Sequence, residues 1–396
     1  MFPKLRFKEF DGDLTESKLV ELTSWASGGT PAKDVPEYWG DGIPLISGAS
    51  MHTNQLYESD VKITKLGLQK GSKLALKDSI LILVRGSMLF NKIPMGITLG
   101  DVAFNQDVKC IRPKQQLAPL FLFQWLHAKE NTIQNKVTAT GIGAGKLDTA
   151  DLQNLKLYKP SLEEQTKIVT FLSAVDEKIS QLTQKHQLLR EYKQGMMQKL
   201  FSQQVRFKAD DKSEFGEWEE KELKDIAEIN PKSKKLPESF IYIDLESVEK
   251  GQLLLQKNIE LQDAPSRAQR LLAKGDVLFQ MVRPYQQNNY YFNLSGEYVA
   301  STGYAQIRTK LDSKFIYYAL HEKTFLDEVM NRCTGTSYPA INSSDLSSIE
   351  ILIPCLEEQT KIANFLSSID QKIEVVAQQI EQAKQWKKGL LQQMFI

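Results

Sequence analysis

Apolar residues recur every three or four positions along two long segments of the chain. The first series runs from Ile168 to Leu200 and the second from Ile362 to Met394. Steps of four and three, sustained over about four heptads, predict a helix whose apolar stripe packs against another helix in a coiled coil. The positions expected to pair are Ile168, Leu172, Val175, Ile179, Leu182, Leu189, Met196, Ile362, Leu366, Ile369, Ile373, Val376, Ile380 and Leu390.

The two segments are copies of each other. Residues 160–179 read PSLEEQTKIVTFLSAVDEKI and residues 354–373 read PCLEEQTKIANFLSSIDQKI, an ungapped match at an offset of 194 residues. A weaker match lies upstream, between Leu5-Arg6-Phe7-Lys8 and Val205-Arg206-Phe207-Lys208. Because this period is far longer than that of a solenoid repeat, it indicates duplication of a whole domain together with its connector.

Each predicted helix has a recognisable start. Ser161 can accept a hydrogen bond from the free amides of the first helix, and Glu164 follows three residues later, as in a capping box. Cys355 takes the cap position of the second helix, which predicts a weaker start there. Gly195 and Gly389 lie inside the helices, where glycine costs about 1 kcal/mol relative to alanine, so we expect close backbone approach at both.

The blocks that precede the helices are different in character. Short β-like runs at 79–84 and 276–282 are followed by helical stretches at 119–130 and 313–330, which predicts an α+β domain with a small twisted sheet in each block. If the duplicated units pair about a pseudo-two-fold axis, the helices form an antiparallel coiled coil and act as a spacer. The alternative is that each helix packs only on its own domain. The expected boundaries are 1–159, 160–204 (helix), 205–353 and 354–396 (helix).

Composition limits the possible partners. The 50 Lys and Arg nearly balance the 49 Asp and Glu, so the net charge of +1 provides no global field for a polyanion, and any nucleic-acid surface must be local. The N-terminal segment has no apolar signal region, and the most apolar run, Ile80–Val84, is too short to cross a bilayer. Three widely spaced cysteines disfavour a disulfide framework or a zinc site. We therefore expect a soluble, cytoplasmic protein.

Polar loops follow the apolar strands and precede the helices. Arg and Lys bind guanine edges and Asn and Gln bind adenine in the DNA major groove, while glycine and hydroxyl residues allow close approach to phosphates. Plain solvated connections and tight turns are the alternative explanation of these loops. The candidate DNA contacts are Arg85, Ser87, Asn91, Lys92, Thr140 and Lys146 in the first block and Arg283, Tyr285, Gln286, Gln287, Asn288, Asn289, Thr334, Ser337 and Tyr338 in the second.

No catalytic constellation emerges from the sequence. The segment Gly141–Lys146 is one residue too short for a phosphate-binding loop and is followed by Leu147 instead of Ser or Thr. None of the four histidines has another His or Cys at metal-ligand spacing, and His127 and His321 occupy matching places typical of structural residues. The helix dipole explains the acidic pairs in the first helical turns, namely Glu163-Glu164 and Glu357-Glu358. We expect no catalytic residue, cofactor site or metal site in this chain.

Two unequal α+β blocks, each followed by a helix that opens with P-x-L-E-E-Q-x-K-I, resemble the specificity subunit of a type I restriction-modification enzyme. Gly29-Thr30-Pro31, Tyr38-Trp39 and Ile43–Ser47 resemble the opening of a target recognition domain of that family, and Ala103–Gln106 resembles its mid-domain segment. The second block departs from this pattern, with Ile229-Asn230-Pro231 and Ala300–Gly303 in those places. The resemblance adds four candidate DNA contacts, Asn105, Gln106, Thr302 and Tyr304.

The resemblance implies a non-catalytic DNA reader for phage defence. Residues 1–159 and 205–353 would be target recognition domains that each read one half of a split, asymmetric site in double-stranded DNA, and the helices would set the spacer between the halves. The subunit would recruit two adenine-N6 methyltransferase subunits, which bind S-adenosylmethionine, and restriction-translocase subunits that use ATP and Mg²⁺. A coiled-coil adapter that binds only proteins remains the alternative. Replacing Arg85 or Gln287 with alanine should relax one half-site and spare the other.

Overall fold

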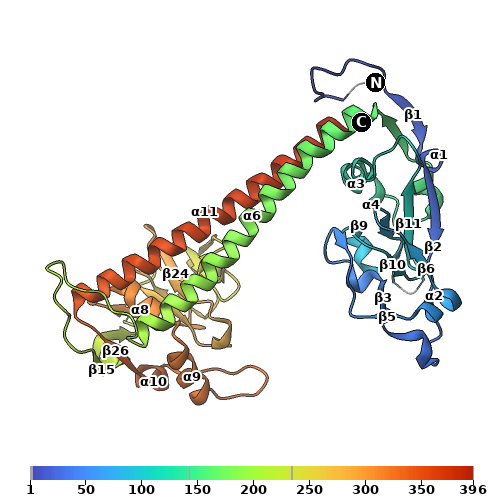
Figure 1. Ribbon diagram of the computed structural model, residues 1–396. Helices are drawn as coiled ribbons and strands as arrows, with labels where there is room; N and C mark the ends of the chain where they lie inside the picture. Colours follow the sequence, from blue (N-terminus) through green and yellow to red (C-terminus); the bar gives the residue numbers. More distant parts are fainter. Residues whose placement is uncertain (1–2, 142, 233–234, 396) are drawn as a thin grey trace. The chain divides into compact units, whose positions relative to one another are not determined.

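The computed structural model describes residues 3–141, 143–232 and 235–395. The chain divides into two compact units, the first formed by residues 1–183 with 378–396 and the second by residues 184–377. Two long helices, α6 (Leu162–Phe201) and α11 (Leu356–Met394), contribute to both units and are the longest elements in Figure 1. Each unit is described by itself below.

The first unit is built around a five-stranded sheet whose central strand, β7 (Ile80–Leu83), is buried along its whole length. Four consecutive apolar side chains suit a strand whose two faces are both covered. Helix α3 (Pro119–Ala128) adds Phe121, Leu122 and Trp125 to the same core. The strand order is β2 (Thr23–Ser27), β11 (Val108–Pro113), β7, β9 (Met95–Thr98) and β4 (Gln55–Leu56), antiparallel except for the β9–β4 pair.

A second sheet of this unit has a parallel pair at its centre, formed by β3 (Trp39–Ile46) and β10 (Val102–Phe104). The chain crosses it closely at Gly28, where an added Cβ would lie 2.0 Å from the carbonyl oxygen of Phe104, so only glycine fits. Other elements of the unit are β1 (Thr15–Lys18), α1 (Leu19–Leu22), β5 (Lys62–Ile63), α2 (Lys65–Gly71), β6 (Lys73–Ala75), α4 (Glu130–Gln134), α5 (Thr149–Gln153) and β14 (Lys156–Lys159).

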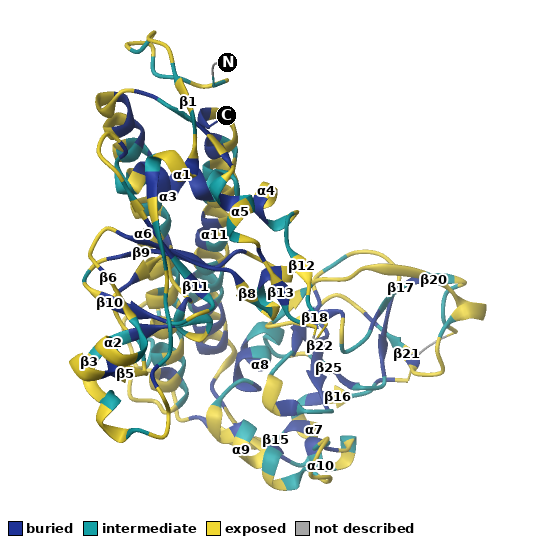
Figure 2. Cartoon of the chain, turned by 90° about the vertical axis from the view of Figure 1, so that its right-hand side faces the viewer, coloured by how far each residue is buried: buried dark blue, intermediate teal, exposed yellow. Residues whose placement is uncertain are grey.

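The second unit repeats this arrangement with different residues. Its central strands, β22 (Val277–Gln280) and β25 (Tyr304–Thr309), are buried almost throughout (Figure 2). They lie in a sheet of order β16 (Ala227–Ile229), β25, β22 and β23 (Tyr290–Tyr291). A second sheet, of order β20 (Lys257–Glu260), β17 (Ser239–Ile243), β24 (Tyr298–Ser301) and β21 (Ala268–Leu271), again has a parallel pair at its centre.

Short strands and helices complete the second unit. They are β15 (Glu219–Glu222), α7 (Leu223–Ile226), β18 (Val248–Glu249), β19 (Gln252–Leu253), α8 (Ser313–Ala319), α9 (Lys323–Arg332), α10 (Ser343–Ser347) and β26 (Glu350–Ile353). The pairing of β15 with β26 matches that of β1 with β14 in the first unit. Both units therefore mix helices with small sheets, and the α+β prediction is confirmed.

In each unit the beginning of one long helix contacts the end of the other. In the first unit, Lys387 of α11 forms an ion pair with Asp176 of α6 at 2.6 Å, and the ring of Trp386 meets that of Phe171 edge-on at 6.1 Å. In the second, Lys193 of α6 pairs with Asp370 of α11, also at 2.6 Å. The two ion pairs are equivalent by the repeat of the sequence.

The apolar stripes of the long helices are largely buried. Among the predicted pairing positions only four are half-buried, Ile179, Leu189, Met196 and Ile373, and the others are buried. In the first unit Ile168, Leu172 and Val175 share a core with Leu390, and in the second Ile362, Leu366 and Ile369 share a core with Leu200. The stripes are therefore packing surfaces, and their pairing as a coiled coil stays a prediction.

Several expectations about the helices need correction. A Cβ added at Gly195 or Gly389 would meet nothing within 4 Å, so the predicted close backbone approach is wrong. Ser161 does cap α6, since its Oγ accepts from the amide of Glu164 at 3.2 Å. The side chain of Glu164, however, does not complete a capping box, because both carboxylate oxygens accept from Arg6, at 2.7 and 2.8 Å.

Candidate nucleic-acid interface

In the first unit a three-stranded sheet brings two candidate loops together. It consists of β8 (Arg85–Gly86), β13 (Gly145–Lys146) and β12 (Thr138–Ala139). In the antiparallel pairing of β8 with β13, Arg85 lies directly opposite Lys146. Residues 61 positions apart in the sequence thus form one surface, which also carries the exposed candidates Ser87, Asn91 and Lys92 just after β8.

Arg85 and Lys146 form an unusual cross-strand pair. Like charges directly opposite each other weaken a strand pair, and among the described residues neither side chain has an ion pair with a carboxylate. Both side chains are exposed. The two cations are therefore free to bind an external acceptor, such as a phosphate or the acceptor edge of a base.

The other candidates of the first unit serve local structure. The hydroxyl of Thr140 donates to the carbonyl oxygen of Ala144 at 2.9 Å and so closes its own loop; Ile142 of that loop lies outside the described residues. Asn105 accepts from the amide of Asp107 at 3.1 Å, and Gln106 accepts from the hydroxyl of Thr30 at 2.7 Å. These contacts occupy groups that the sequence offered as DNA contacts.

The second unit brings its two candidate loops together in the same way. Isolated bridges join Val282 to Ala340 and Ala340 to Thr334, and the amide of Arg283 donates to the carbonyl oxygen of Pro339 at 2.7 Å. The loops border an open groove of about 710 Å³ whose lining includes Arg283, Gln286, Asn288, Tyr338, Lys250, Glu246 and Glu249. We call this the second-unit groove.

The loop beside the groove is held in an uncommon backbone conformation. Arg283 (φ 54°) and Gln287 (φ 53°) both have a left-handed backbone and flank the 3₁₀ turn Pro284–Gln286. The left-handed conformation costs about 1–2 kcal/mol for each non-glycine residue. Gln280, only 2% exposed, holds this loop. Its Nε2 donates to the carbonyl oxygen of Val282 at 2.8 Å, and its Oε1 accepts from the amide of Asn288 at 3.1 Å. The loop is therefore fixed before any ligand binds.

Three candidates of this unit make contacts inside the fold instead of facing a ligand. Asn289 is 1% exposed and accepts from the amide of Gln280 at 2.8 Å. Tyr304 lies in the core, where burial raises the pKa of its hydroxyl. The amide of Gln287 points at the carbonyl oxygen of His321, 3.5 Å away, so it anchors the loop. The other candidates still have solvent-accessible side chains. Exposed are Tyr285, Gln286, Thr334, Ser337 and Tyr338, and half-buried are Arg283, Asn288 and Thr302.

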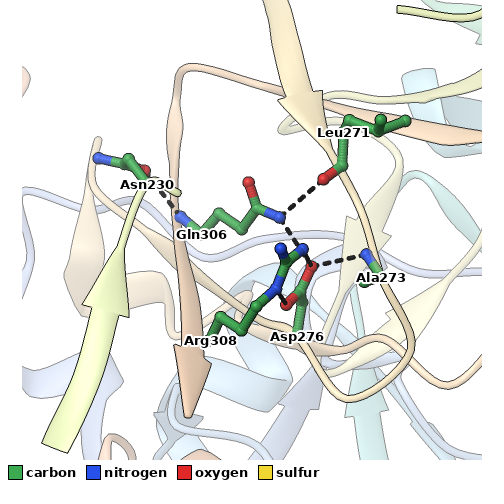
Figure 3. A network of polar contacts seen from close by, with 6 residues as sticks. All are labelled: Asn230, Leu271, Ala273, Asp276, Gln306 and Arg308. Atoms are coloured by element: carbon green, nitrogen blue, oxygen red, sulfur yellow. Dashed lines mark hydrogen bonds and ion pairs between the residues drawn. The ribbon is translucent and has the colours of Figure 1, made fainter. Parts of the chain in front are cut away.

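A buried polar network that the sequence did not reveal joins the start of β22 to β25 (Figure 3). Asp276, 1% exposed, accepts from two nitrogens of Arg308, at 2.7 and 2.8 Å, and from Gln306 at 2.7 Å. The backbone N–H of Gln306 donates to the Oδ1 of Asn230 at 2.9 Å. Because Asp276 immediately precedes β22, the network fixes β22 against β25 and so positions Gln280. An acidic residue at the start of an apolar strand was the only sequence signal.

His321 connects the groove loop to the helical layer. Its Nδ1 donates to the carbonyl oxygen of Tyr317 at 2.7 Å, because a carbonyl can only accept, and its Nε2 lies 3.4 Å from the amide nitrogen of Asn289. The neutral ring thus accepts from Asn289 through Nε2. Protonation would place two donors face to face, since the other end of the Asn289 amide is held by Gln280.

Acidification should therefore destabilise the second unit. Burial, reinforced by the charge of Lys193 and opposed by that of Asp370, lowers the pKa of His321 from 6.5 to about 4. The contribution of neutral His321 to the free energy of unfolding is complete above pH 6.5. It is lost as the pH falls toward 4, because the unfolded chain binds the proton at a higher pH than the folded chain. We expect the free energy of unfolding to fall by about 2 kcal/mol, after allowance for the partial exposure of the His321 side chain. Denaturant unfolding at several pH values checks this, and His321→Gln should flatten the profile between pH 6.5 and 4. An unchanged slope in the variant would contradict it.

The part of the chain that the structure describes contains no group of three or more His, Cys, Asp or Glu residues able to hold a metal ion. No described helix is both long and apolar enough to cross a membrane.

Comparison with known proteins agrees with the duplicated architecture. The model of the type I restriction modification DNA specificity domain matches the chain twice, at residues 12–190 and 216–385. The MjaVIII specificity subunit of a type I restriction enzyme from Methanocaldococcus jannaschii is 27% identical, over 97% of this chain and 94% of that protein. The EcoR124I/EcoR124II specificity subunit from Escherichia coli is 30% identical, over 46% of this chain and 45% of its own length.

Solved structures share the fold. The S subunit of a type I restriction-modification system from M. genitalium gives a TM-score of 0.60 at 16% identity and covers 100% of this chain and 99% of its own. A chain from a structure of type I system assembly and conformational transition gives 0.58 at 17% identity, over 96% and 97% of the two chains. With the domain model matching both halves, the chain belongs to the family of type I restriction modification DNA specificity proteins.

Proposed function

We propose that this chain reads a bipartite, asymmetric DNA sequence as the specificity subunit of a type I restriction-modification complex. The observation that carries the proposal is that each unit builds the same scaffold and places different side chains at the equivalent loops. The first unit offers Arg85 opposite Lys146, and the second offers Arg283 beside Tyr338. Different side chains at equivalent places suit a target whose two halves differ in sequence.

In this proposal the long helices set the distance between the two recognition domains. The ion pairs Lys387–Asp176 and Lys193–Asp370, each within one unit, support an antiparallel coiled coil with pseudo-two-fold symmetry. In that arrangement the helices would determine how many base pairs separate the two half-sites. The ranges 1–159 and 205–353 would then be the target recognition domains.

The proposal leaves chemistry to partner subunits in the cytoplasm. Two methyltransferase subunits would supply the S-adenosylmethionine site, and restriction subunits would use ATP and Mg²⁺. The M. jannaschii and E. coli relatives are named as specificity subunits of type I restriction enzymes. We expect partner subunits to cover apolar side chains that the long helices expose, namely Leu188, Tyr192, Val375 and Trp386.

Footprinting of the assembled complex tests the function. The chain is combined with methyltransferase subunits and mixed with DNA fragments from the host genome, and protected fragments are sequenced. We expect protection of one discrete sequence with two specified halves and an unspecified spacer. A protein that binds methyltransferase subunits but protects no discrete sequence would instead be a protein adapter.

Replacing Arg85 with alanine should relax one half-site only. Loss of its contact is expected to weaken discrimination at one position by about 1–3 kcal/mol, because the exposed guanidinium forms no ion pair with any described carboxylate. The Lys323→Ala variant, which removes an exposed ion pair with Asp327, serves as control. Measured methylation rates on DNA with single-base changes check this, and equal weakening in both halves would contradict independent readers.

A further inference from the structure

The second-unit groove is lined by hydrogen-bond donors whose orientation the structure fixes. Gln280 donates to Val282 and accepts from the amide of Asn288, so its Nε2 must face Gln286. Gln286 consequently turns its Oε1 to Gln280, at 2.9 Å, and keeps its NH₂ group for the exposed side. The contacts of Gln280 determine which end of its own side-chain amide, and of that of Gln286, is the nitrogen. The outward orientation of the Gln286 NH₂ group therefore follows from the hydrogen-bond network.

Asn288 and Arg283 add further donors. The Oδ1 of Asn288 accepts from the backbone amide of Lys250 at 3.0 Å, and no described residue accepts from its NH₂ group. The guanidinium of Arg283 lies over the ring of Tyr338, with its Cζ 4.3 Å from the ring centroid, and among the described residues no carboxylate or carbonyl accepts from it. Stacking on an aromatic face restricts a guanidinium while leaving its N–H edge available. The groove thus holds an oriented, unpaired donor fork.

The charges around these donors favour a neutral ligand over a phosphate. Glu246 and Glu249 line the same groove and offset Arg283 and Lys250, which itself pairs with Glu249 at 3.3 Å. Among the described residues, no carboxylate forms an ion pair with Arg85 or Lys146 of the first unit. A phosphate would be repelled by the two carboxylates. A base edge carries no net charge, and carboxylates can accept from the amino group of cytosine.

We propose that the second-unit groove reads a guanine of a G·C pair, with Arg283 as the specificity-determining residue and Tyr338 as its platform. Guanine presents two adjacent acceptors, N7 and O6, in the major groove, while adenine and cytosine present an amino donor and thymine presents a single acceptor beside a methyl group. A groove of donors therefore fits guanine best. This inference rests on the proposed function and adds the identity of one base.

The test compares Arg283→Lys with the unmodified chain, each assembled with its methyltransferase subunits. Lysine keeps the charge but loses the planar fork. Methylation rates are measured on a library in which each position of both half-sites is varied. We expect the variant to lose roughly 5- to 150-fold of its discrimination at one position, at which the unmodified complex requires guanine. All other positions should be unchanged.

Matched variants separate reading from folding. Arg283→Gly suits the left-handed backbone and should relax the same position if Arg283→Lys fails to assemble. Tyr338→Phe keeps the ring and should retain discrimination, whereas Tyr338→Ala should lose part of it. Arg85→Lys should change the other half-site.

The outcomes are distinct. Relaxation at a position that required another base, or an unchanged requirement in both Arg283 variants, would overturn the inference. Weaker binding to every sequence with a smaller salt dependence would show a phosphate contact instead and would also overturn it. If the unmodified complex itself has no bipartite preference, the proposed function fails.

Discussion

Insertion of seven residues into each long helix should move methylation to sites with a longer spacer and abolish it at the original site. The insertions are placed between Gln184 and Lys185 in α6 and between Gln378 and Gln379 in α11, which are equivalent positions of the repeat. One heptad in each helix preserves the apolar stripe and lengthens it by about 10 Å, close to three base pairs at about 3.4 Å each.

Sequencing of modified adenines in cells that carry the complex measures this effect. Both half-site sequences should be retained, because the reading loops are untouched. The same heptad inserted into α6 alone should abolish methylation without creating a new site, since the stripes then no longer match. As a control, insertion beside the exposed Asp211 should leave the spacer unchanged. An unaltered spacer in the double insertion would show that the helices do not set the distance.

Replacing Arg206 with alanine should destabilise the second unit by about 3–5 kcal/mol. The carboxylate of Glu358 has no solvent exposure and accepts from Arg206 at 3.1 and 2.7 Å and from the indole of Trp218 at 3.1 Å. The hydrogen bond between Arg206 and Glu358 raises the pKa of Arg206. Removing the guanidinium leaves a buried negative charge to which, among the described residues, the neutral indole of Trp218 still donates.

Denaturant unfolding followed by intrinsic fluorescence measures this loss. Lys208→Ala, which breaks an exposed ion pair with Glu214 at 2.6 Å, should change stability by no more than about 1 kcal/mol. The double variant Arg206→Met with Glu358→Leu should recover much of the loss, because an apolar pair avoids the desolvation of both charges. A single variant as stable as the Lys208→Ala control would show that Glu358 does not depend on Arg206.

The sequence predicted the repeat and its helices well, because both are local or periodic signals. The match of Leu5–Lys8 with Val205–Lys208 was seen only as part of the repeat, and the structure shows that it contains the equivalent ion pairs Arg6–Glu164 and Arg206–Glu358. The acidic pairs were assigned to the helix dipole, and that was incomplete, since Glu164 and Glu358 are buried partners of arginines more than 150 residues away. Partners so distant in sequence leave no local trace.

The candidate reading residues were predicted only by type. Loops rich in Arg, Asn and Gln stood out, yet the sequence could not tell Gln286, whose NH₂ group faces outward, from Asn289, which is buried. That difference arises from Gln280, a polar residue inside an apolar strand whose partners are fixed only in the folded state. Arg85 opposite Lys146 was equally hidden, because strand register brings the two together.

Gln280 holds the main chain of the loop, while other side chains face the solvent, and this separation bears on how new specificities arise. Its bonds to Val282 and Asn288 grip the main chain, so neighbouring side chains such as Tyr285 and Tyr338, both more than half exposed, can be exchanged without disturbing the fold. Point changes at these positions are therefore expected to alter the bases that are read while the fold is kept, and a randomised library at these positions tests this in the laboratory.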